Sequence, residues 1–275
     1  MSNPYRNGDV PLSEISSFRI PYGNHPSQYG DLRLPTSLGR SPIVVSIHGG
    51  FWQSKYGLEL NDPIVEDLTR RGYATWNIEY RRVGENGGGW TGTFDDVIDA
   101  INQLTQLEKS YPLDLSRIVI LGHSAGGHLA LWLASRNHTQ NDAFEKTLRI
   151  PIKHVISLAG ITDLKRTWEI HLESGLDGSL VSSFLDGTPH EVPDRYRLAS
   201  PIEQLPIPAT QLLIHGELDR HVPVELSIAY HQKAVEQGAH VRLLTLPEAE
   251  HFQLIDPASS AWKSVIDSLE TLFSE

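Results

Sequence analysis

The chain has 275 residues, of which 39% are hydrophobic and 21% charged, so it can build a large core and is not disordered by composition. Its net charge of −11 argues against binding to nucleic acid or to an anionic membrane surface. The absence of cysteine excludes disulfides, thiolate metal sites and a cysteine nucleophile. The first twenty residues lack a secretory signal pattern, and no apolar run is long enough for a membrane helix, so we expect a cytoplasmic protein.

Short apolar runs alternate along the chain with segments of helical periodicity. The runs predict strands at residues 43–47, 73–78, 117–121, 154–158, 211–214 and 241–246. The periodic segments predict helices near residues 63–70, 94–104, 125–135, 224–236 and 258–269. Near-continuous apolar strands separated by helices indicate an α/β fold with a mainly parallel central sheet and helices on both faces. Ligands of such sheets bind at the carboxyl ends of the strands, so the loops after strands are where a site is expected.

Two segments interrupt this alternation. Residues 84–92 form a glycine-rich loop after a strand. Residues 161–208 contain many turn residues and no clear strand, although they lie between two strands. We interpret this second segment as a cap-like insertion within a single domain that spans residues 1–275, because it is too short to form a second domain.

The sequence Gly-His-Ser-Ala-Gly at residues 122–126 follows a predicted strand and precedes a predicted helix. This is the context of a nucleophile elbow, in which a sharp turn exposes the serine hydroxyl and leaves room only for glycine two positions away on either side. Ser124 is therefore the candidate nucleophile.

A serine hydroxyl needs a base, and in folds built around this elbow an acid and a histidine follow the serine in chain order. Asp219 follows the predicted strand 211–214, and Glu217 is its rival; we favour Asp219 because it stands further past the strand end. His251 follows the last predicted strand and is the candidate base. Asp219 would fix the tautomer of His251, which would take the proton of Ser124.

An oxyanion requires backbone donors. Ala125 N–H, directly after the nucleophile, is one candidate, and the loop that begins His-Gly-Gly-Phe-Trp at residue 48 supplies Gly50 and Phe51 as the others. Three aromatic residues near these loops are candidate substrate contacts: Trp52, Trp90 and Trp168. We find no metal-ligand motif and no phosphate-binding loop, and we expect no cofactor.

The chain resembles the α/β-hydrolase superfamily, on motifs between about residues 44 and 252. The motif at residues 48–53 together with the elbow resembles kynurenine formamidase (arylformamidase), which implies a cofactor-free triad of Ser124, Asp219 and His251. The chain is also similar to the hormone-sensitive-lipase-like esterases, including Glu-Tyr-Arg at residues 79–81, although Phe51 replaces the third glycine of their H-G-G-G motif. A third resemblance is to the catalytic domain of prolyl-oligopeptidase-type peptidases.

The expected function is hydrolysis of a small-molecule ester or amide through an acyl-enzyme intermediate, by a formamidase-like or carboxylesterase-like enzyme. Two alternatives stay open: a prolyl-oligopeptidase-like peptidase, and a non-catalytic binding module on a hydrolase scaffold. An edge strand and the final helix are candidate contact surfaces for a homodimer.

Overall fold

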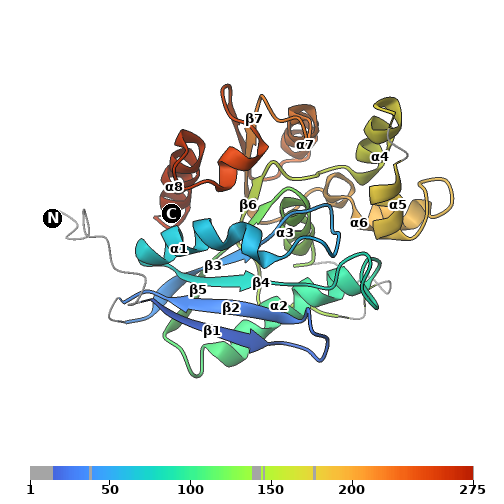
Figure 1. Ribbon diagram of the computed structural model, residues 1–275. Helices are drawn as coiled ribbons and strands as arrows, with labels where there is room; N and C mark the ends of the chain where they lie inside the picture. The colour runs from blue at the N-terminus through green and yellow to red at the C-terminus, as the bar shows by residue number, and fades with distance from the viewer. Residues whose placement is uncertain (1–14, 37–38, 138–143, 145, 176–177, 275) are drawn as a thin grey trace.

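The structure is a computed structural model that describes residues 15–36, 39–137, 144, 146–175 and 178–274. Eight strands form one sheet in the order β1-β2-β4-β3-β5-β6-β7-β8 (Figure 1). The pairs from β4 through β3 to β8 are parallel, and β2 runs antiparallel to both of its neighbours. The mainly parallel sheet that the sequence predicts is therefore confirmed. The strands are β1 (Ser16–Pro21), β2 (Tyr29–Leu34), β3 (Ser41–Ile47), β4 (Ala74–Ile78), β5 (Leu113–His123), β6 (His154–Leu158), β7 (Thr210–Gly216) and β8 (Val241–Leu246).

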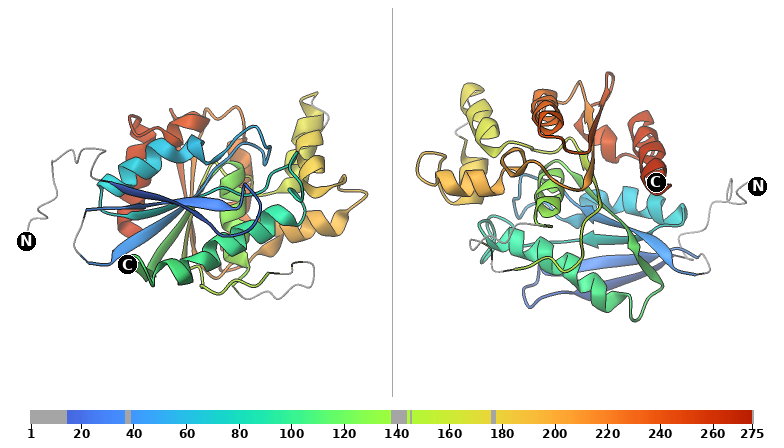
Figure 2. Two further views of the ribbon diagram at one scale, coloured as in Figure 1. Left: turned by 60° about the horizontal axis from the view of Figure 1, so that its bottom comes forward. Right: turned by 180° about the vertical axis from the view of Figure 1, so that it is seen from behind.

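Helices cover both faces of the sheet. Figure 2 shows α1 and α8 on one side of the strands and α2 and α3 on the other. The helices are α1 (Asp62–Arg70), α2 (Gly92–Leu107), α3 (Ala125–Ser135), α4 (Leu164–Glu173), α5 (Ser179–Leu185), α6 (Pro193–Ala199), α7 (Val224–Glu236) and α8 (Ser260–Leu272), with short 3₁₀ turns η2 (Leu58–Asn61), η3 (Pro201–Gln204) and η4 (His251–Ile255). This layering buries the apolar strands on both faces, as a parallel sheet requires.

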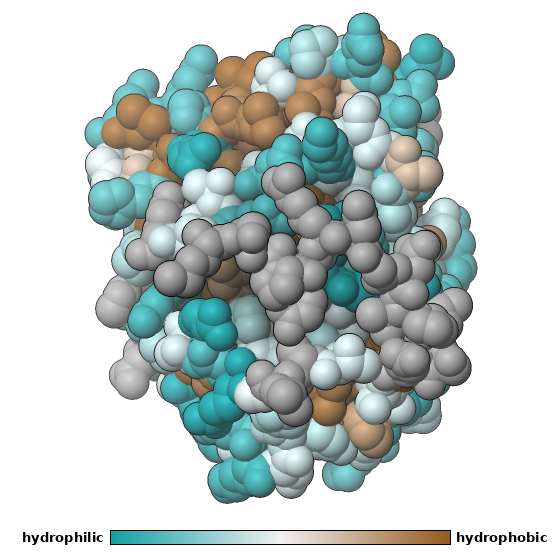
Figure 3. Space-filling view, turned by 90° about the vertical axis from the view of Figure 1, so that its left-hand side faces the viewer, coloured by the Kyte–Doolittle hydropathy of each residue, from teal (hydrophilic) through white to brown (hydrophobic). Residues whose placement is uncertain are grey.

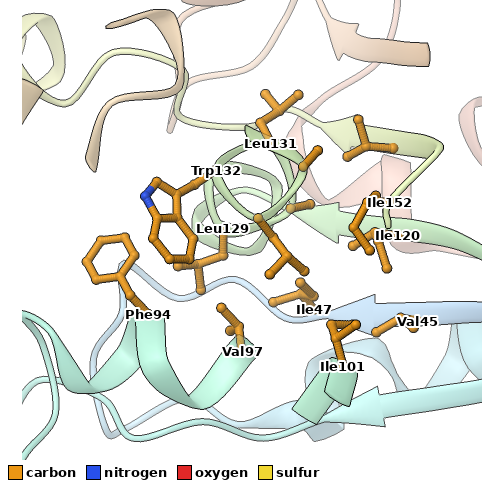
Figure 4. Close-up of a cluster of buried hydrophobic side chains, with 14 of the residues drawn as sticks. Val45, Ile47, Phe94, Val97, Ile101, Ile120, Leu129, Leu131, Trp132 and Ile152 are labelled. Carbon is orange, nitrogen blue, oxygen red and sulfur yellow. The ribbon is translucent and has the colours of Figure 1, made fainter. Parts of the chain in front are cut away.

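Alternate residues of each central strand belong to two separate cores. In β3, Val45 packs into the core shared with α2 and α3, whereas Val44 packs into the core shared with α1 and α8. Ile120 and Val119 of β5 divide in the same way. Figure 4 shows the first core, where side chains from β3 and β5 meet those of α2 and α3. The period of two along the strands thus explains why these segments are apolar at nearly every position.

Strands β1 and β2 are absent from the sequence-based prediction, which is wrong in this region. The side chains of β1 are mostly exposed, so its sequence lacks the apolar alternation that marks a half-buried strand. β1 joins the sheet through backbone pairing with β2, whose register runs from Ser16 opposite Leu34 to Pro21 opposite Tyr29. Pairing of this kind leaves little signal in side-chain patterns.

The segment between β6 and β7 folds into α4, α5, α6 and η3, apart from residues 176–177, which lie outside the described ranges. In Figure 1, α4, α5 and α6 gather on the side toward which the arrow of β4 points, which is the carboxyl end of the parallel strands. Phe184 of α5 stacks on Trp52 with 4.2 Å between ring centroids, and its carbonyl accepts a hydrogen bond from the backbone N–H of Trp90. These helices therefore contact both the loop after β3 and the glycine-rich loop.

The opposite side of the molecule is shown in Figure 3, where apolar residues gather near the top and hydrophilic residues predominate below. Among the residues that the structure describes, no helix combines the length and the apolar character needed to cross a bilayer. Residues 1–14, which include most of the segment where we expect no secretory signal, lie outside the described ranges.

Candidate active site

Ser124 lies at the sharp turn between β5 and α3. Its backbone torsions, φ 56° and ψ −120°, lie outside the regions preferred by residues with a side chain, so the turn is strained. A Cβ atom at Gly122 would come within 2.1 Å of the carbonyl oxygen of Gly126, and one at Gly126 within 2.0 Å of the carbonyl oxygen of Ile47. Both positions therefore require glycine, and the turn has the geometry of a nucleophile elbow.

The loop after β3 packs directly against this elbow. A Cβ atom at Gly49 would lie 3.0 Å from the Cβ of Ser124, so the missing side chain permits the close approach. The next three residues all have positive φ: Gly50 at 107°, Phe51 at 50° and Trp52 at 57°. Such turns allow successive N–H groups to face one anion. The first N–H groups of α3 have no acceptor within the helix, so they too are available to donate to an anion at the elbow.

The loops after β7 and β8 bring the candidate acid and base together. Nδ1 of His251 lies 2.5 Å from Oδ2 of Asp219, and both side chains are buried. The other carboxylate oxygen of Asp219 accepts hydrogen bonds from the backbone N–H groups of His221 and Val222, at 2.8 and 2.9 Å. Glu217 is exposed. The structure thus places Asp219, and not its rival, against His251.

The surroundings of this pair set its charge. Burial alone would raise the pKa of Asp219, but hydrogen bonds from His215 and His251 outweigh burial and hold this pKa well below its usual range. Burial lowers the pKa of His251, and the neighbouring Asp219 carboxylate offsets only part of that effect. The pair is therefore a carboxylate beside a neutral imidazole near pH 7.

The imidazole of His251 lies against the residue that precedes the nucleophile. The ring centroids of His123 and His251 are 4.5 Å apart, and Nε2 of His123 donates to the carbonyl oxygen of His251 at 3.1 Å. Burial holds the pKa of His123 well below its ordinary value, so this ring is neutral. Within the described residues, no hydrogen bond joins the side chains of Ser124 and His251.

A buried polar network supports the loop after β3 from behind. His48 contacts Oε1 of Glu79 through Nε2 at 2.8 Å and the carbonyl oxygen of Gly49 through Nδ1, also at 2.8 Å. The hydroxyl of Tyr80 donates to the carbonyl oxygen of His48, and Arg82 forms a 2.9 Å ion pair with Glu79. Residues 79–82 thus anchor the loop structurally, in agreement with the esterase-like Glu-Tyr-Arg motif.

The prediction that Trp52 contacts the substrate directly is wrong, because this residue is 0% exposed. The ring of Phe184 stacks on Trp52, and the ring of His128 lies nearly perpendicular to it, with 5.1 Å between the centroids of Trp52 and His128. Its neighbour Phe51 is only partly buried and lies 5.7 Å, centroid to centroid, from His171 of α4. Phe51 and Trp52 thus both join the loop after β3 to the insertion, and Phe51 is the one that is partly exposed.

The other two candidate tryptophans are partly buried in packing clusters. Trp90 packs edge-on against Phe94, with 5.6 Å between centroids. Trp168 donates from its indole N–H to the hydroxyl of Ser182 at 3.0 Å, which ties α4 to α5. Both side chains therefore have packing partners within the protein, and their contact with a substrate stays a prediction.

Two buried residues behind Asp219, His215 and Ser227, are absent from the sequence-based prediction. Nε2 of His215 lies 3.3 Å from Oδ2 of Asp219, and its Nδ1 contacts the hydroxyl of Ser227 at 2.7 Å. The available signal was the position of His215 at the end of a strand, four residues before the candidate acid. Within the described ranges, histidine and carboxylate side chains nowhere gather in a group that could hold a metal ion.

A mainly parallel eight-stranded sheet with helices on both faces and a strained serine elbow defines this chain as an α/β-hydrolase. More narrowly, the BD-FAE family profile matches residues 31–234, which is well over half of the chain, so the chain belongs to the BD-FAE family.

Curated relatives are similar at moderate identity. A probable isoprenylcysteine alpha-carbonyl methylesterase of Oryza sativa subsp. japonica is 25% identical over 239 residues, covering 84% of this chain and 56% of the relative. An uncharacterized peptidase, YtmA, of Bacillus subtilis (strain 168) is 28% identical over 207 residues, covering 74% of this chain and 73% of the relative. Kynurenine formamidase of Danio rerio is 26% identical over 147 residues, covering 53% and 46%. The resemblance drawn from the motifs is confirmed, and this chain spans little more than half of the rice relative.

Solved structures agree on the fold. Esterase B from Lactobacillus rhamnosis superposes with a TM-score of 0.81 and 19% identity, covering 98% of this chain and 90% of that chain. A truncated carbohydrate esterase from gut microbiota superposes with a TM-score of 0.77 and 22% identity, covering 94% and 97%. At these identities the likeness establishes the shared α/β-hydrolase fold.

Proposed function

We propose that this protein is a serine hydrolase that cleaves a small ester or amide through an acyl-enzyme intermediate. The observation that carries the proposal is the 2.5 Å contact between His251 and Asp219 beside the strained turn at Ser124. An elbow serine after β5, a carboxylate after β7 and an imidazole after β8 are the parts that serine hydrolysis needs. The names of the relatives, which include a methylesterase and a formamidase, support the same chemistry.

In the first half of the reaction, the hydroxyl oxygen of Ser124 attacks the carbonyl carbon while Nε2 of His251 takes the hydroxyl proton. Asp219 accepts the Nδ1–H of His251, which fixes the tautomer and stabilises the imidazolium that forms. The negative oxygen is held by the N–H groups of Gly50, Phe51 and Ala125, each worth about 3 kcal/mol in such sites. His251 then gives its proton to the leaving group, which departs.

In the second half, His251 takes a proton from a water molecule, and the resulting hydroxide attacks the acyl carbon bound to Ser124. The second tetrahedral intermediate collapses, Ser124 recovers its proton from His251, and the acid is released. Neither half needs a cofactor, because the chain's own side chains supply every proton transfer.

The partly buried Phe51 at the oxyanion loop suits an aryl group, as in an aryl formamide or an aryl ester. A peptidase is the second candidate, because a relative that is aligned over 73% of its length is named a peptidase.

Steady-state rates on N-formyl-kynurenine, short p-nitrophenyl esters and aminoacyl arylamides would separate these candidates. We expect the esters or the formamide to be cleaved much faster than the arylamides. Fast cleavage of the arylamides would favour the peptidase. Negligible cleavage of the formamide together with fast cleavage of the esters would exclude a formamidase.

A non-catalytic binding module on the same scaffold is the alternative outside enzymology. Labelling with a fluorophosphonate tests it, because this probe reacts only with an activated serine. We expect covalent labelling at Ser124 in the native protein and none after unfolding; a native protein without label would favour the binding module.

A further inference from the structure

Asp219 contacts a second histidine besides His251. His215, at the end of β7, is completely buried, and its Nε2 lies 3.3 Å from Oδ2 of Asp219, the same oxygen that contacts His251. The same Nε2 lies 2.8 Å from the carbonyl oxygen of Val222. On the far side of the ring, Nδ1 lies 2.7 Å from the hydroxyl of Ser227 in α7.

These partners determine where the proton of His215 resides. Nε2 faces two acceptors, a carboxylate oxygen and a carbonyl oxygen, so Nε2 must carry the hydrogen and donate it. The hydroxyl of Ser227 can donate to Nδ1, which then needs no proton of its own. The ring is thereby held as the neutral Nε2–H tautomer, with every ring nitrogen paired.

We propose that His215 is a positioning residue that orients the carboxylate of Asp219 toward His251, and that Ser227 holds His215 in the required tautomer. The proposal rests on the proposed serine-hydrolase function. It places two members behind Asp219: Ser227, which hydrogen-bonds His215, and His215, whose Nε2 donates to the carbonyl oxygen of Val222 and lies 3.3 Å from Oδ2 of Asp219.

A neutral donor suits this position for an electrostatic reason. Asp219 must keep its negative charge available to His251, because that charge stabilises the imidazolium formed when the serine proton is taken. A cation behind Asp219 would compete for the charge, whereas a neutral N–H restrains the carboxylate and leaves the charge in place. Backbone N–H groups of His221 and Val222 already hold the other oxygen, so His215 removes the remaining freedom of rotation.

The sign of the pH effect follows from the groups around His251. Burial lowers the pKa of His251, the Asp219 carboxylate raises it, His221 lowers it, and His123 packs against the same ring. Because the neutral ring of His215 carries no charge, its removal acts on His251 only through the N–H that Asp219 loses, which leaves more of the carboxylate charge facing His251. The acid limb of the kcat/KM profile is then expected to move to higher pH.

The test compares two substitutions of similar shape, His215→Gln and His215→Met. Glutamine can place an amide N–H near the position of Nε2, whereas methionine cannot donate. We expect His215→Met to lose about tenfold in kcat with little change in KM, equivalent to about 1.4 kcal/mol. We expect His215→Gln to stay within about threefold of the wild type. Equal losses in both variants, or no loss in either, would overturn the proposal.

A spectroscopic readout makes the test independent of turnover. The proton between Nδ1 of His251 and Asp219 should give a strongly downfield NMR resonance, shifted or broadened in His215→Met and in Ser227→Ala but retained in His215→Gln. Thr69→Val removes another buried hydroxyl, in α1, and serves as the control that should leave the resonance and the pH profile unchanged. An inactive wild type would refute the proposed function alone, whereas an unperturbed resonance in Ser227→Ala and His215→Met would refute this inference alone.

Discussion

The expected reactivity of Ser124 and His251 comes from their immediate surroundings. The serine is held in a backbone conformation that costs about 1–3 kcal/mol and is maintained by the packing of β5, α3 and the loop after β3. The imidazole is buried, and the Asp219 carboxylate keeps one ring nitrogen occupied. If the proposed serine hydrolysis takes place, these surroundings are what fix the positions of both side chains.

Replacement of the nucleophile should separate chemistry from folding. Ser124→Ala removes the hydroxyl but adds no atom to the crowded turn, so we expect kcat to fall by a factor on the order of 10⁴ or more. The melting temperature should stay within a few degrees, because the hydroxyl is not needed for packing. Ester hydrolysis and thermal unfolding measured on the same preparation check both statements; substantial residual turnover would point to a different nucleophile.

The lowered pKa of His251 predicts the pH dependence of the reaction. The imidazole must be neutral to accept a proton, and burial favours the neutral form. Activity should accordingly fall as the pH drops, with a kcat/KM midpoint below the ordinary histidine value of about 6.5. A midpoint above that value, or a flat profile from pH 5 to 8, would argue against His251 as the base.

Four strands of the parallel part of the sheet each lead into one loop of the candidate site. β3 leads into the candidate oxyanion loop, β5 into Ser124, β7 into Asp219 and β8 into His251. Because the carboxyl ends of parallel strands lie at one edge of the sheet, residues that are distant in sequence become neighbours there. The close approach of the first two loops depends on glycine.

Gly49→Ala tests that close approach. The new Cβ would lie 2.9 Å from the carbonyl oxygen of His123 and 3.0 Å from the Cβ of Ser124, so the loop must move away from the elbow. Since displaced N–H groups no longer reach the oxyanion, we expect kcat to fall about a hundredfold with a smaller change in KM.

The matched control is Gly238→Ala. Gly238 has φ 73° and no heavy atom within 4 Å of an added Cβ, so alanine there adds backbone strain without a steric clash. It should lower the free energy of unfolding by about 1 kcal/mol and leave kcat unchanged. If Gly49→Ala behaves like Gly238→Ala, the loop after β3 is not the oxyanion donor.

Across the whole molecule, the insertion and the sheet are joined through buried polar groups. His128 of α3 is completely buried and donates from Nε2 to the carbonyl oxygen of Ala199, at the end of α6. Burial lowers the pKa of His128 to about 3, although this hydrogen bond opposes the change. The contact therefore links the helix of the nucleophile elbow to the insertion through an uncharged histidine.

This burial makes the folded molecule sensitive to acid. The unfolded chain binds a proton at His128 below about pH 6.5, whereas the folded chain does not until about pH 3, so stability is lost as the pH falls between these values. His128 alone should cost about 3 kcal/mol between pH 6.5 and pH 4. Urea unfolding of His128→Gln, which keeps an amide donor but cannot titrate, should show a correspondingly weaker pH dependence; an identical dependence would contradict this account.

Local patterns in the sequence were sufficient to predict the main strands and helices, the elbow, and the loops that carry Asp219 and His251. Each of these predictions rests on residues that are close in sequence: an apolar run, a helical period, or two glycines around a serine. The absence of a distinctive pattern explains the omission of β1, whose side chains are mostly exposed and which pairs through its backbone.

The burial of Trp52 and the contact of His215 with Asp219 were decided only by the tertiary structure, which also places Asp219, the residue favoured from the sequence, against His251. Each depends on which loops meet at the carboxyl edge of the sheet and on what packs against them. The sequence by itself determined the class of fold and the kind of chemistry, because both are encoded in short-range patterns of residues. The folded chain determined which side chains face one another, because burial and orientation arise from contacts between segments that are far apart in sequence.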